Sequence, residues 1–422
     1  MFVDLKYGRS GLRVRVPDDA TVILPRELAG LPDEPAALRN ALAQPIGAAP
    51  LVDALRPADR VSIVFSDITR PMPSDRVLPV LLEEIARVVP PEQVVLINAT
   101  GTHMANTRDE LIGMLGRDVV ERYRIVNHDA WDTENLVDLG RTPQGHRVLV
   151  NRLFYEADYR ILTGFIEPHI FAGFSGGPKA VLPGVAGIES IMDNHGYAML
   201  GDPRATWGVV EGNPVWEEMR AFARIVRPSF SVNVTLNRLG QITGVYAGDM
   251  ERAHAEGVSL VRSHAMVPVD GQYEVVLTTN SGYPLDINLY QTIKGLSAAM
   301  QVVRPGGSII IASECRGGIP DYGEYRRLVV EGASPEGILE MIAAPGFRCH
   351  DQWEAQLHAQ IMQAASVYVY SDGLADEQIR EMLFEPTHDI EATIARELER
   401  HGPETRLLVM PEGPQSIPYI RA

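Results

Sequence analysis

Short apolar runs alternate with helical patterns along the chain, and this alternation constrains the fold more than any other feature of the sequence. Each run is bounded by turn residues, and the segments between runs repeat apolar residues at three-to-four spacing, as in Val77 to Val88. The runs span Val61 to Phe65, Val94 to Asn98, Arg160 to Phe165, Glu274 to Asn280, Ser308 to Ser313, Val367 to Ser371 and Leu407 to Met410. Strands that alternate with helices predict an α/β fold.

The length of 422 residues indicates two or three domains, at roughly 150 residues per domain, and we choose two. Pro268 and Gly271 interrupt the preceding helical pattern, so we place a linker at residues 266–273. We therefore predict two α/β domains, residues 1–268 and 273–402, with the active site in the cleft between them. The tail, residues 403–422, holds one more strand-like run and is a candidate to return to the first domain.

The charge of the chain excludes several classes of partner. Thirty-eight basic and 55 acidic residues give a net charge of −17, which repels nucleic acid and anionic membrane surfaces. A small anionic substrate therefore needs locally placed cations. The N-terminus lacks an apolar signal region and no run of about 18 apolar residues occurs, so we expect a cytoplasmic protein. Cys315 and Cys349 are too few for a zinc cluster or a disulfide framework, and we expect two buried thiols.

Two polar segments directly follow predicted strands, where open α/β sheets place their ligand sites. Ser66 to Pro71 contains an Asp, a Thr and an Arg, and the hydroxyl and guanidinium groups can bind a carboxylate or phosphate. Asn98 to His103 ends in a histidine before the helix that a Thr107–Glu110 capping box is expected to begin. Taken singly, the first segment can be a turn that bonds its own backbone, and the second can hold a structural histidine.

The third and most informative segment is Thr163 to Gly184, followed by Asp193 to Gly196. Its clustered glycines indicate a backbone that lies close to a ligand or adopts positive φ angles. Pro178 and Ala180 exclude a Walker loop, because that motif needs Gly before the lysine and Ser or Thr after it. Lys179 can instead anchor a cofactor covalently. Here too a tight loop with structural histidines remains an alternative reading of each part.

Together these segments resemble the nickel-dependent lactate racemase family, whose members are nickel pincer nucleotide-dependent racemases and epimerases of 2-hydroxyacids. The resemblance is carried by DxTR at Asp67 to Arg70, TGTH at Thr100 to His103, and EPHxFAGFSGGxK at Glu167 to Lys179. It extends through the Asn194-His195 pair and Gln291 to Lys294, and so covers nearly the whole chain.

The resemblance implies a cofactor and the residues that hold it. The nickel pincer nucleotide is a pyridinium-3-thioamide-5-thiocarboxylate mononucleotide with nickel, made by separate cofactor-biosynthesis proteins. Lys179 would carry it through the thioamide link, and His195 would supply the remaining nickel ligand, a role that imidazole suits. Asp67 and Thr69 would help position the cofactor or catalytic groups. The loop residues implied in cofactor binding are Ser175, Gly176 and Gly177.

The resemblance also implies the catalytic and substrate-binding residues. His103 and His169 would be paired general acids and bases, each contributing roughly 10²- to 10⁴-fold to the rate. The substrate carboxylate would be bound by Arg70, Gln291 and Lys294, and the apolar walls would be Phe171 and Trp353.

The implied reaction has a chemical reason. The C2 hydrogen of a 2-hydroxycarboxylate is barely acidic, because the neighbouring carboxylate is already negative. Removing that hydrogen as hydride leaves a planar 2-keto acid, to whose two faces hydride can return. Met104 departs from the basic or polar residue expected after His103, which points to a substituent at C2 larger than the methyl group of lactate. The sequence leaves this substituent and the oligomeric state open.

Three other functions remain as alternatives. A zinc-dependent hydrolase could use His103, His169 and His195 as ligands, but it leaves Lys179 and Arg70 without a role. A nicotinamide dehydrogenase is disfavoured because residues 281–284, Ser-Gly-Tyr-Pro, replace the GxGxxG turn after the strand. A non-catalytic cofactor carrier would not need the paired histidines or the carboxylate-binding cations.

Overall fold

The computed structural model describes residues 1–421 and divides into two compact units. Unit 1 comprises residues 1–26, 196–203 and 264 onward, and unit 2 comprises residues 27–195 and 204–263. Each unit contains its own six-stranded sheet, together with helices. The predicted α/β class and the two-domain organisation are therefore confirmed.

The sheet of unit 2 has the strand order β13-β12-β9-β4-β5-β6 and is parallel except for β13. In this order the strands are Ile242–Gly248, Phe230–Leu236, Tyr159–Phe165, Val61–Ser66, Val94–Ala99 and Arg124–Asn127. Ile63 and Ile161 on the adjacent strands β4 and β9 are fully buried. Central parallel strands are covered on both faces, which explains why their sequences are continuous apolar runs.

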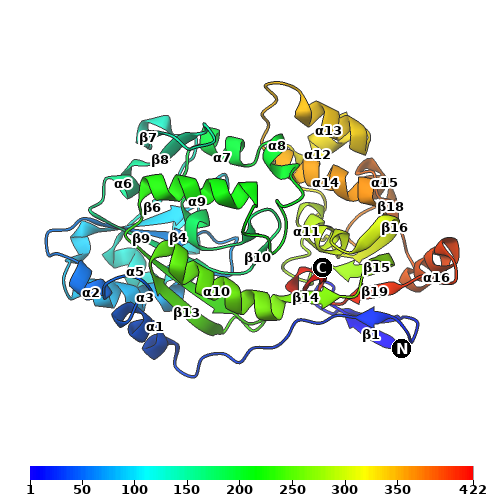
Figure 1. Ribbon diagram of the computed structural model, residues 1–422, viewed down its shortest axis with the longest axis horizontal. Helices are drawn as coiled ribbons and strands as arrows, with labels where there is room; N and C mark the ends of the chain where they lie inside the picture. Colours follow the sequence, from blue (N-terminus) through cyan, green and yellow to red (C-terminus); the bar gives the residue numbers. More distant parts are fainter. Residues whose placement is uncertain (422) are drawn as a thin grey trace. The chain divides into compact units, whose positions relative to one another are not determined.

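Helices α1 (Glu34–Ala43), α3 (Ser74–Ala86) and α5 (Arg117–Arg122), labelled in Figure 1, bury one face of this sheet together with α4 (Arg108–Leu115). The expected capping box begins α4, since the Thr107 hydroxyl accepts from the Glu110 backbone and Glu110 bonds back to Thr107. The other helices of unit 2 are α2 (Leu51–Ala54), α6 (Arg152–Tyr155), α7 (Ile188–Asn194), α9 (Pro214–Val226) and α10 (Met250–Ala265). Its smaller sheets pair β7 (Leu136–Arg141) with β8 (Arg147–Asn151), and β10 (Pro168–His169) with β11 (Gly173–Phe174).

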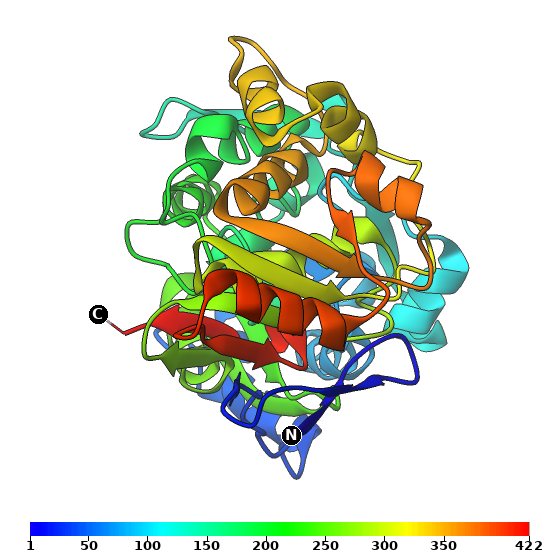
Figure 2. The ribbon, with the colours of Figure 1, turned by 90° about the vertical axis from the view of Figure 1, so that its right-hand side faces the viewer.

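The sheet of unit 1 is parallel, with the order β18-β17-β16-β15-β19-β3. In this order the strands are Glu385–Pro386, Ala365–Tyr370, Val303–Ala312, Tyr273–Thr279, Leu407–Met410 and Thr21–Val22. On one face, α16 (Ile390–His401) packs with the hairpin of β1 (Phe2–Leu5) and β2 (Leu12–Arg15). Helices α11 (Leu289–Met300) and α14 (Gln352–Ala364) pack together on the opposite face from α16 (Figure 2). The remaining helices are α8 (Tyr197–Leu200), α12 (Tyr325–Gly332), α13 (Pro335–Ala343) and α15 (Asp376–Glu381).

The division of the chain differs from the predicted domain boundaries. Residues 1–26 belong to unit 1, because β3 pairs with β19 and the β1–β2 hairpin packs against α16. The tail pairs with residues 21–22 of the predicted first domain, but both segments belong to unit 1, where β19 lies between β15 and β3 in the sheet. The predicted linker contains a strand, β14 (Met266–Val269), which pairs with β20 (Ile417–Ile420). A two-residue strand such as β3 leaves no readable periodicity, and distant pairing partners are not visible in a local pattern.

Each predicted apolar run forms a strand, namely β4, β5, β9, β15, β16, β17 and β19. Cys315 is buried as expected, whereas Cys349 is partly exposed, so the prediction of two buried thiols is wrong for Cys349. Among residues 1–421, no helix has the length and hydropathy needed to cross a membrane.

Candidate active site

The carboxyl ends of β4 and β5 bring Asp67 and His103 into contact. Asp67 Oδ2 lies 2.6 Å from His103 Nδ1, although the two residues are 36 positions apart in the sequence. The Thr69 hydroxyl donates to Asp67 Oδ1 at 2.6 Å, and the Thr69 backbone N–H donates to the same oxygen at 2.8 Å. Adjacent parallel strands end at the same edge of a sheet, so residues that directly follow them meet there.

The electrostatics of this pair favour an ionised Asp67. Burial, which leaves Asp67 only 3% exposed, would by itself raise the pKa of its carboxyl group. The hydrogen bond and charge of His103, the Thr69 hydroxyl and the charge of Arg70 outweigh burial and hold the pKa of Asp67 below its ordinary value. A carboxylate at Nδ1 fixes the tautomer of His103 with the proton on Nδ1, which leaves Nε2 able to accept a proton.

Hydrogen bonds between polar groups hold the loop that carries His103, which follows β5, in place. Asn98 donates from Nδ2 to Asn106 Oδ1 at 2.9 Å, and the Thr100 hydroxyl donates to the backbone carbonyl of His128. Gly101 donates from its backbone N–H to the Gly184 carbonyl at 3.1 Å. This last bond joins the His103 loop to the segment that follows Lys179.

Lys179 lies in a short 3₁₀ helix, Gly177–Ala180, that the glycine-rich loop leads into. Gly176 and Gly177 have φ angles of +79° and +54°. A Cβ atom on Gly177 would lie 2.8 Å from the ring of His254, and one on Gly176 would lie 2.8 Å from Asn233 Oδ1. Of the two causes that the sequence left open for these glycines, a nearby ligand or positive φ angles, the positive φ angles are observed, and both glycines also pack closely against other protein atoms.

Ser175 uses its hydroxyl within the same loop. The Ser175 O–H group donates to the Phe165 carbonyl at 2.9 Å, and its oxygen accepts from the Glu167 backbone N–H at 2.9 Å. Its backbone carbonyl accepts from His254 Nε2 at 2.8 Å. These contacts hold the loop to the end of β9, so the Ser175 side chain is engaged with main-chain groups.

His169 and Phe171 come from the hairpin between β10 and β11. His169 Nδ1 accepts from the backbone N–H groups of Phe171 at 3.3 Å and Ala172 at 3.2 Å. In the neutral ring this places the proton on Nε2, the tautomer opposite to that of His103. The Phe171 ring lies 6.3 Å from the rings of both His169 and His195, in edge-to-face contact with each.

His195 directly follows α7 and is 8% exposed. Burial, and then the charge of Lys179, lower the pKa of His195 to about 4, against the opposing effect of a backbone hydrogen bond with Ile191. The imidazole is therefore neutral near pH 7. Unit 2 thus brings His195 within electrostatic reach of Lys179 and into contact with Phe171.

The other predicted substrate residues belong to unit 1. Lys294 and Gln291 lie one turn apart on α11, and Lys294 Nζ donates to Gln291 Oε1 at 2.8 Å. Trp353, on α14, is 9% exposed and donates from Nε1 to the Tyr290 hydroxyl at 3.2 Å. These residues therefore form one connected group on two packed helices.

The sequence did not single out three polar residues of this group: Tyr290, Asp351 and Glu354. The Tyr290 hydroxyl donates to Asp351 Oδ1 at 3.3 Å, and Glu354 is 5% exposed. The sequence places Tyr290 beside Gln291 and Glu354 beside Trp353, but nothing in their local pattern indicates that Glu354 is buried. Acidic side chains next to an apolar helix face are rarely buried without a reason.

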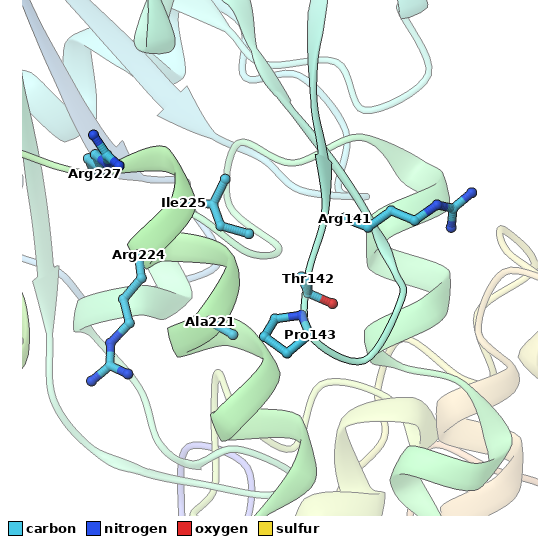
Figure 3. A pocket seen from close by; sticks show the side chains of 7 residues that line it. All are labelled: Arg141, Thr142, Pro143, Ala221, Arg224, Ile225 and Arg227. Atoms are coloured by element: carbon cyan, nitrogen blue, oxygen red, sulfur yellow. The ribbon is translucent and has the colours of Figure 1, made fainter.

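A pocket of about 550 Å³ in unit 2 contains none of these residues. Its lining residues are Arg141, Thr142, Pro143, Ala221, Arg224, Ile225 and Arg227 (Figure 3). Figure 3 shows the guanidinium groups of Arg141 and Arg224 pointing in different directions, and Arg224 forms an ion pair with Glu251 at 2.6 Å. The arginines therefore do not converge on an anion.

The described residues contain no group of three His, Cys, Asp or Glu side chains suitable for holding a metal ion. The alternative of a zinc hydrolase on His103, His169 and His195 therefore lacks the ligand cluster that it requires.

The chain is 35% identical over 420 residues to the lactate racemase of Thermoanaerobacterium thermosaccharolyticum, covering 97% of both proteins. The chain belongs to the lactate racemase family. The family model of the lactate racemase N-terminal domain matches residues 7–208, and the family model of the lactate racemase C-terminal domain matches residues 269–417. The lactate racemase of Lactiplantibacillus plantarum is 35% identical over 377 residues, 89% of each protein. The chain is therefore an isomerase of the racemase type, and the resemblance inferred from the motifs is confirmed.

Solved structures agree with this membership. The lactate racemase apoprotein from T. thermosaccharolyticum matches with a TM-score of 0.92 at 34% identity, over 100% of both chains. A protein from Thermotoga maritima matches with a TM-score of 0.69 at 19% identity, over 94% of this chain and 100% of its own, and shares the fold.

Proposed function

We propose that this lactate racemase family member inverts C2 of a 2-hydroxycarboxylate by reversible hydride transfer to a nickel pincer nucleotide covalently attached to Lys179. The observation that carries the proposal is that His195, a buried imidazole in edge-to-face contact with Phe171, lies close enough to Lys179 for the lysine charge to act on it. An amine that can be acylated and a neutral nitrogen ligand, in one place, are what a covalently attached metal nucleotide requires.

The residues present fit this cofactor. A metal-binding histidine must be deprotonated, and His195 needs no proton release at neutral pH. Lys179 would form the covalent link, His195 would be a nickel ligand, and Gly176 and Gly177 would lie along the loop that presents Lys179. When bound, the nucleotide would supply an acceptor for the hydride that leaves C2.

His103 would move the proton of the substrate hydroxyl group. Its Nε2 would accept that proton, while the Asp67 carboxylate at 2.6 Å from Nδ1 stabilises the resulting imidazolium. His169, whose Nδ1 accepts from two backbone N–H groups, would hold the oxygen through Nε2–H. The two histidines would thus begin from opposite tautomers, and their roles toward the two enantiomers would be unequal.

Arg70, Gln291 and Lys294 would bind the substrate carboxylate. Because the chain has a net charge of −17, it needs such local cations to attract an anionic substrate. Phe171 and Trp353 would form apolar walls beside the carbon skeleton. Met104, which directly follows His103, is 84% exposed, and Ile68, which directly follows Asp67, is 49% exposed. These apolar side chains next to the acid–base pair favour lactate or a 2-hydroxyacid with a larger apolar substituent.

The test is to produce the chain in the cytoplasm together with the cofactor-biosynthesis proteins and screen enantiopure 2-hydroxyacids for loss of optical rotation. We expect loss of rotation with lactate or a larger homologue, by the cofactor-loaded chain and not by the chain made alone. Retention of rotation by every acid, with fully loaded protein, contradicts the proposal. Zinc in stoichiometric amount, without the visible absorbance of the nucleotide, would favour the alternative hydrolase.

A further inference from the structure

Glu354 is a buried carboxyl group that the reaction described above does not use. It lies on α14, directly after Trp353, and is 5% exposed. Its Oε1 is completely buried and has no hydrogen-bond partner among the described residues. A buried carboxyl oxygen without a hydrogen bond is costly, so its presence needs a physical explanation.

The side chains around Glu354 are fixed, which keeps its surroundings constant. Trp353 donates to the Tyr290 hydroxyl at 3.2 Å, and that hydroxyl donates to Asp351 Oδ1 at 3.3 Å. Asp351 Oδ2 accepts from the backbone N–H of Glu324 at 2.9 Å. This chain of hydrogen bonds connects the first turn of α14 to α11, the helix that carries Lys294.

The charges that act on Glu354 are few. Burial raises the pKa of its carboxyl group to about 8, with Lys294 lowering it and Asp351 raising it. Lys294 and Tyr290 come from α11 and Tyr325 from α12, and both tyrosines respond to the charge of Glu354. His350 is within 3.4 Å of Asp351, and His358, one turn further along α14, is held neutral by burial, with a pKa of about 3.

The other elements packed against α14 contribute ionisable groups that are exposed or turned to another face. Tyr197 of α8 is 39% exposed, and Glu336 and Glu340 of α13 are exposed. In β16, Arg304 pairs with Glu274, and Tyr368 and Tyr370 of β17 pack into the core on the α16 face. Lys294 is thus the cation that acts on Glu354.

One ammonium group then faces two carboxyl groups once a substrate carboxylate binds at Lys294. In a buried site, two carboxylates that share one cation cannot both remain ionised at little cost, and the weaker acid takes a proton. Burial raises the pKa of Glu354 to about 8, which makes it the weaker acid of the two. At pH values where Glu354 is ionised in the free protein, it therefore takes up the proton, and its Oε1, which has no hydrogen-bond partner among the described residues, can carry it.

We propose that Glu354 is a positioning residue for Lys294 that, when it is ionised, takes up one proton from solvent as a substrate carboxylate binds, so that the charge of the Lys294 ammonium group is left to act on the substrate. This inference rests on the proposed function, because it uses Lys294 as a carboxylate-binding residue. Glu354 determines how many protons the site binds, and it does not itself contact the reacting carbon.

The test is titration calorimetry of the full-length chain with lactate and with propionate, which has no hydroxyl group to react. Each titration is done in two buffers of different ionisation enthalpy, from which proton uptake is obtained directly. We expect uptake to rise from near zero at pH 6 toward one proton at pH 9, and affinity to fall about tenfold per pH unit above the pKa of Glu354.

Glu354→Gln, which mimics the protonated acid, should abolish both the uptake and the pH dependence, and Glu336→Gln, an exposed control on α13, should change neither. Carboxylate binding without proton uptake by the unsubstituted chain overturns the inference even if Glu354→Gln fails to fold, and so does unchanged uptake in a folded Glu354→Gln. Absence of any carboxylate binding overturns it as well. Glu354-dependent uptake in a chain that racemises no 2-hydroxyacid would uphold this inference and refute the proposed function instead.

Discussion

Asp67 and His103 follow two adjacent parallel strands and meet with 2.6 Å between Asp67 Oδ2 and His103 Nδ1. The contact fixes the orientation of the His103 ring and places the Asp67 carboxylate at Nδ1, while the His103 side chain remains 44% exposed. This arrangement supports a base that can accept a proton at Nε2 and return it.

Asp67→Asn should lower kcat by roughly 10²- to 10⁴-fold, because the imidazolium that forms on His103 loses its counter-charge. KM should change less than kcat, since the Asp67 side chain forms hydrogen bonds with His103 and Thr69, while Arg70 acts on it through its charge. Steady-state racemisation by the cofactor-loaded variant measures both constants. Asp75→Asn, at an exposed position in the first turn of α3, is the control. An Asp67→Asn variant with undiminished kcat would show that the carboxylate does not assist His103.

The stability of the protein should fall as the pH falls from 6.5 toward 4. His254 is fully enclosed, with a pKa lowered by burial to about 4, so in this window the unfolded chain binds a proton that the folded chain does not. At pH 5 this group alone should reduce the free energy of unfolding by about 2 kcal/mol relative to pH 7. Urea unfolding at several pH values measures the slope. His254→Gln, which can still donate to the Ser175 carbonyl, should make the slope shallower without abolishing it, because buried His195 and His358 have lowered pKa values too. An equally steep slope in that variant would rule out a contribution from His254.

Lys179→Ala should abolish the covalent cofactor. The sequence has three lysines, Lys6, Lys179 and Lys294, so the candidates for an amine anchor can be tested exhaustively. Intact-protein mass spectrometry after production with the biosynthesis proteins gives the adduct mass and occupancy. Lys6→Ala, at an exposed position in the β1–β2 turn, should keep full occupancy. An adduct at full occupancy in Lys179→Ala would place the anchor elsewhere.

His195→Ala should keep the organic adduct and lose nickel, because one ligand is removed while the covalent anchor remains. Metal analysis after exposure to a chelator, beside the adduct mass, separates the two effects. His388→Ala, a 76% exposed histidine, is the control. Nickel stoichiometry and chelator resistance equal to those of the unsubstituted chain would exclude His195 as a ligand.

The sequence was most informative where function and local pattern coincide. Buried parallel strands such as β4 and β9 are continuous apolar runs, and their pattern alone is enough to place the residues that follow them at one sheet edge. This is why Asp67 and His103 could be picked out as candidates. Their mutual contact could not be predicted, because the direction of a side chain in this loop depends on the hydrogen bonds that Asn98 and Thr100 form beneath it.

Some features could not be predicted from the sequence, because they depend on strand pairing between distant segments or on the burial of a side chain. The two-residue strand β3 joins β19 across the whole length of the chain, and no local period predicts that pairing. Glu354 has the sequence context of an ordinary helix glutamate, and only its burial distinguishes it. Similarly, Gly176 and Gly177 were ambiguous from sequence, and only the positions of Asn233 and His254 give the physical reason for them.

Substrate carrying deuterium at C2 distinguishes inversion by hydride transfer from inversion by proton transfer. The anionic substrate is more easily oxidised toward a cationic acceptor than deprotonated beside its own carboxylate, so deuterium should leave C2 as deuteride and return to C2. His103 and His169 would handle only the hydroxyl proton, and single-turnover oxidation of each enantiomer should respond unequally to their replacement. We expect racemised product that retains its deuterium, with a trace of 2-keto acid on rapid quenching. Complete washout of deuterium into solvent during turnover, with no 2-keto acid, would contradict it and indicate proton transfer between two bases.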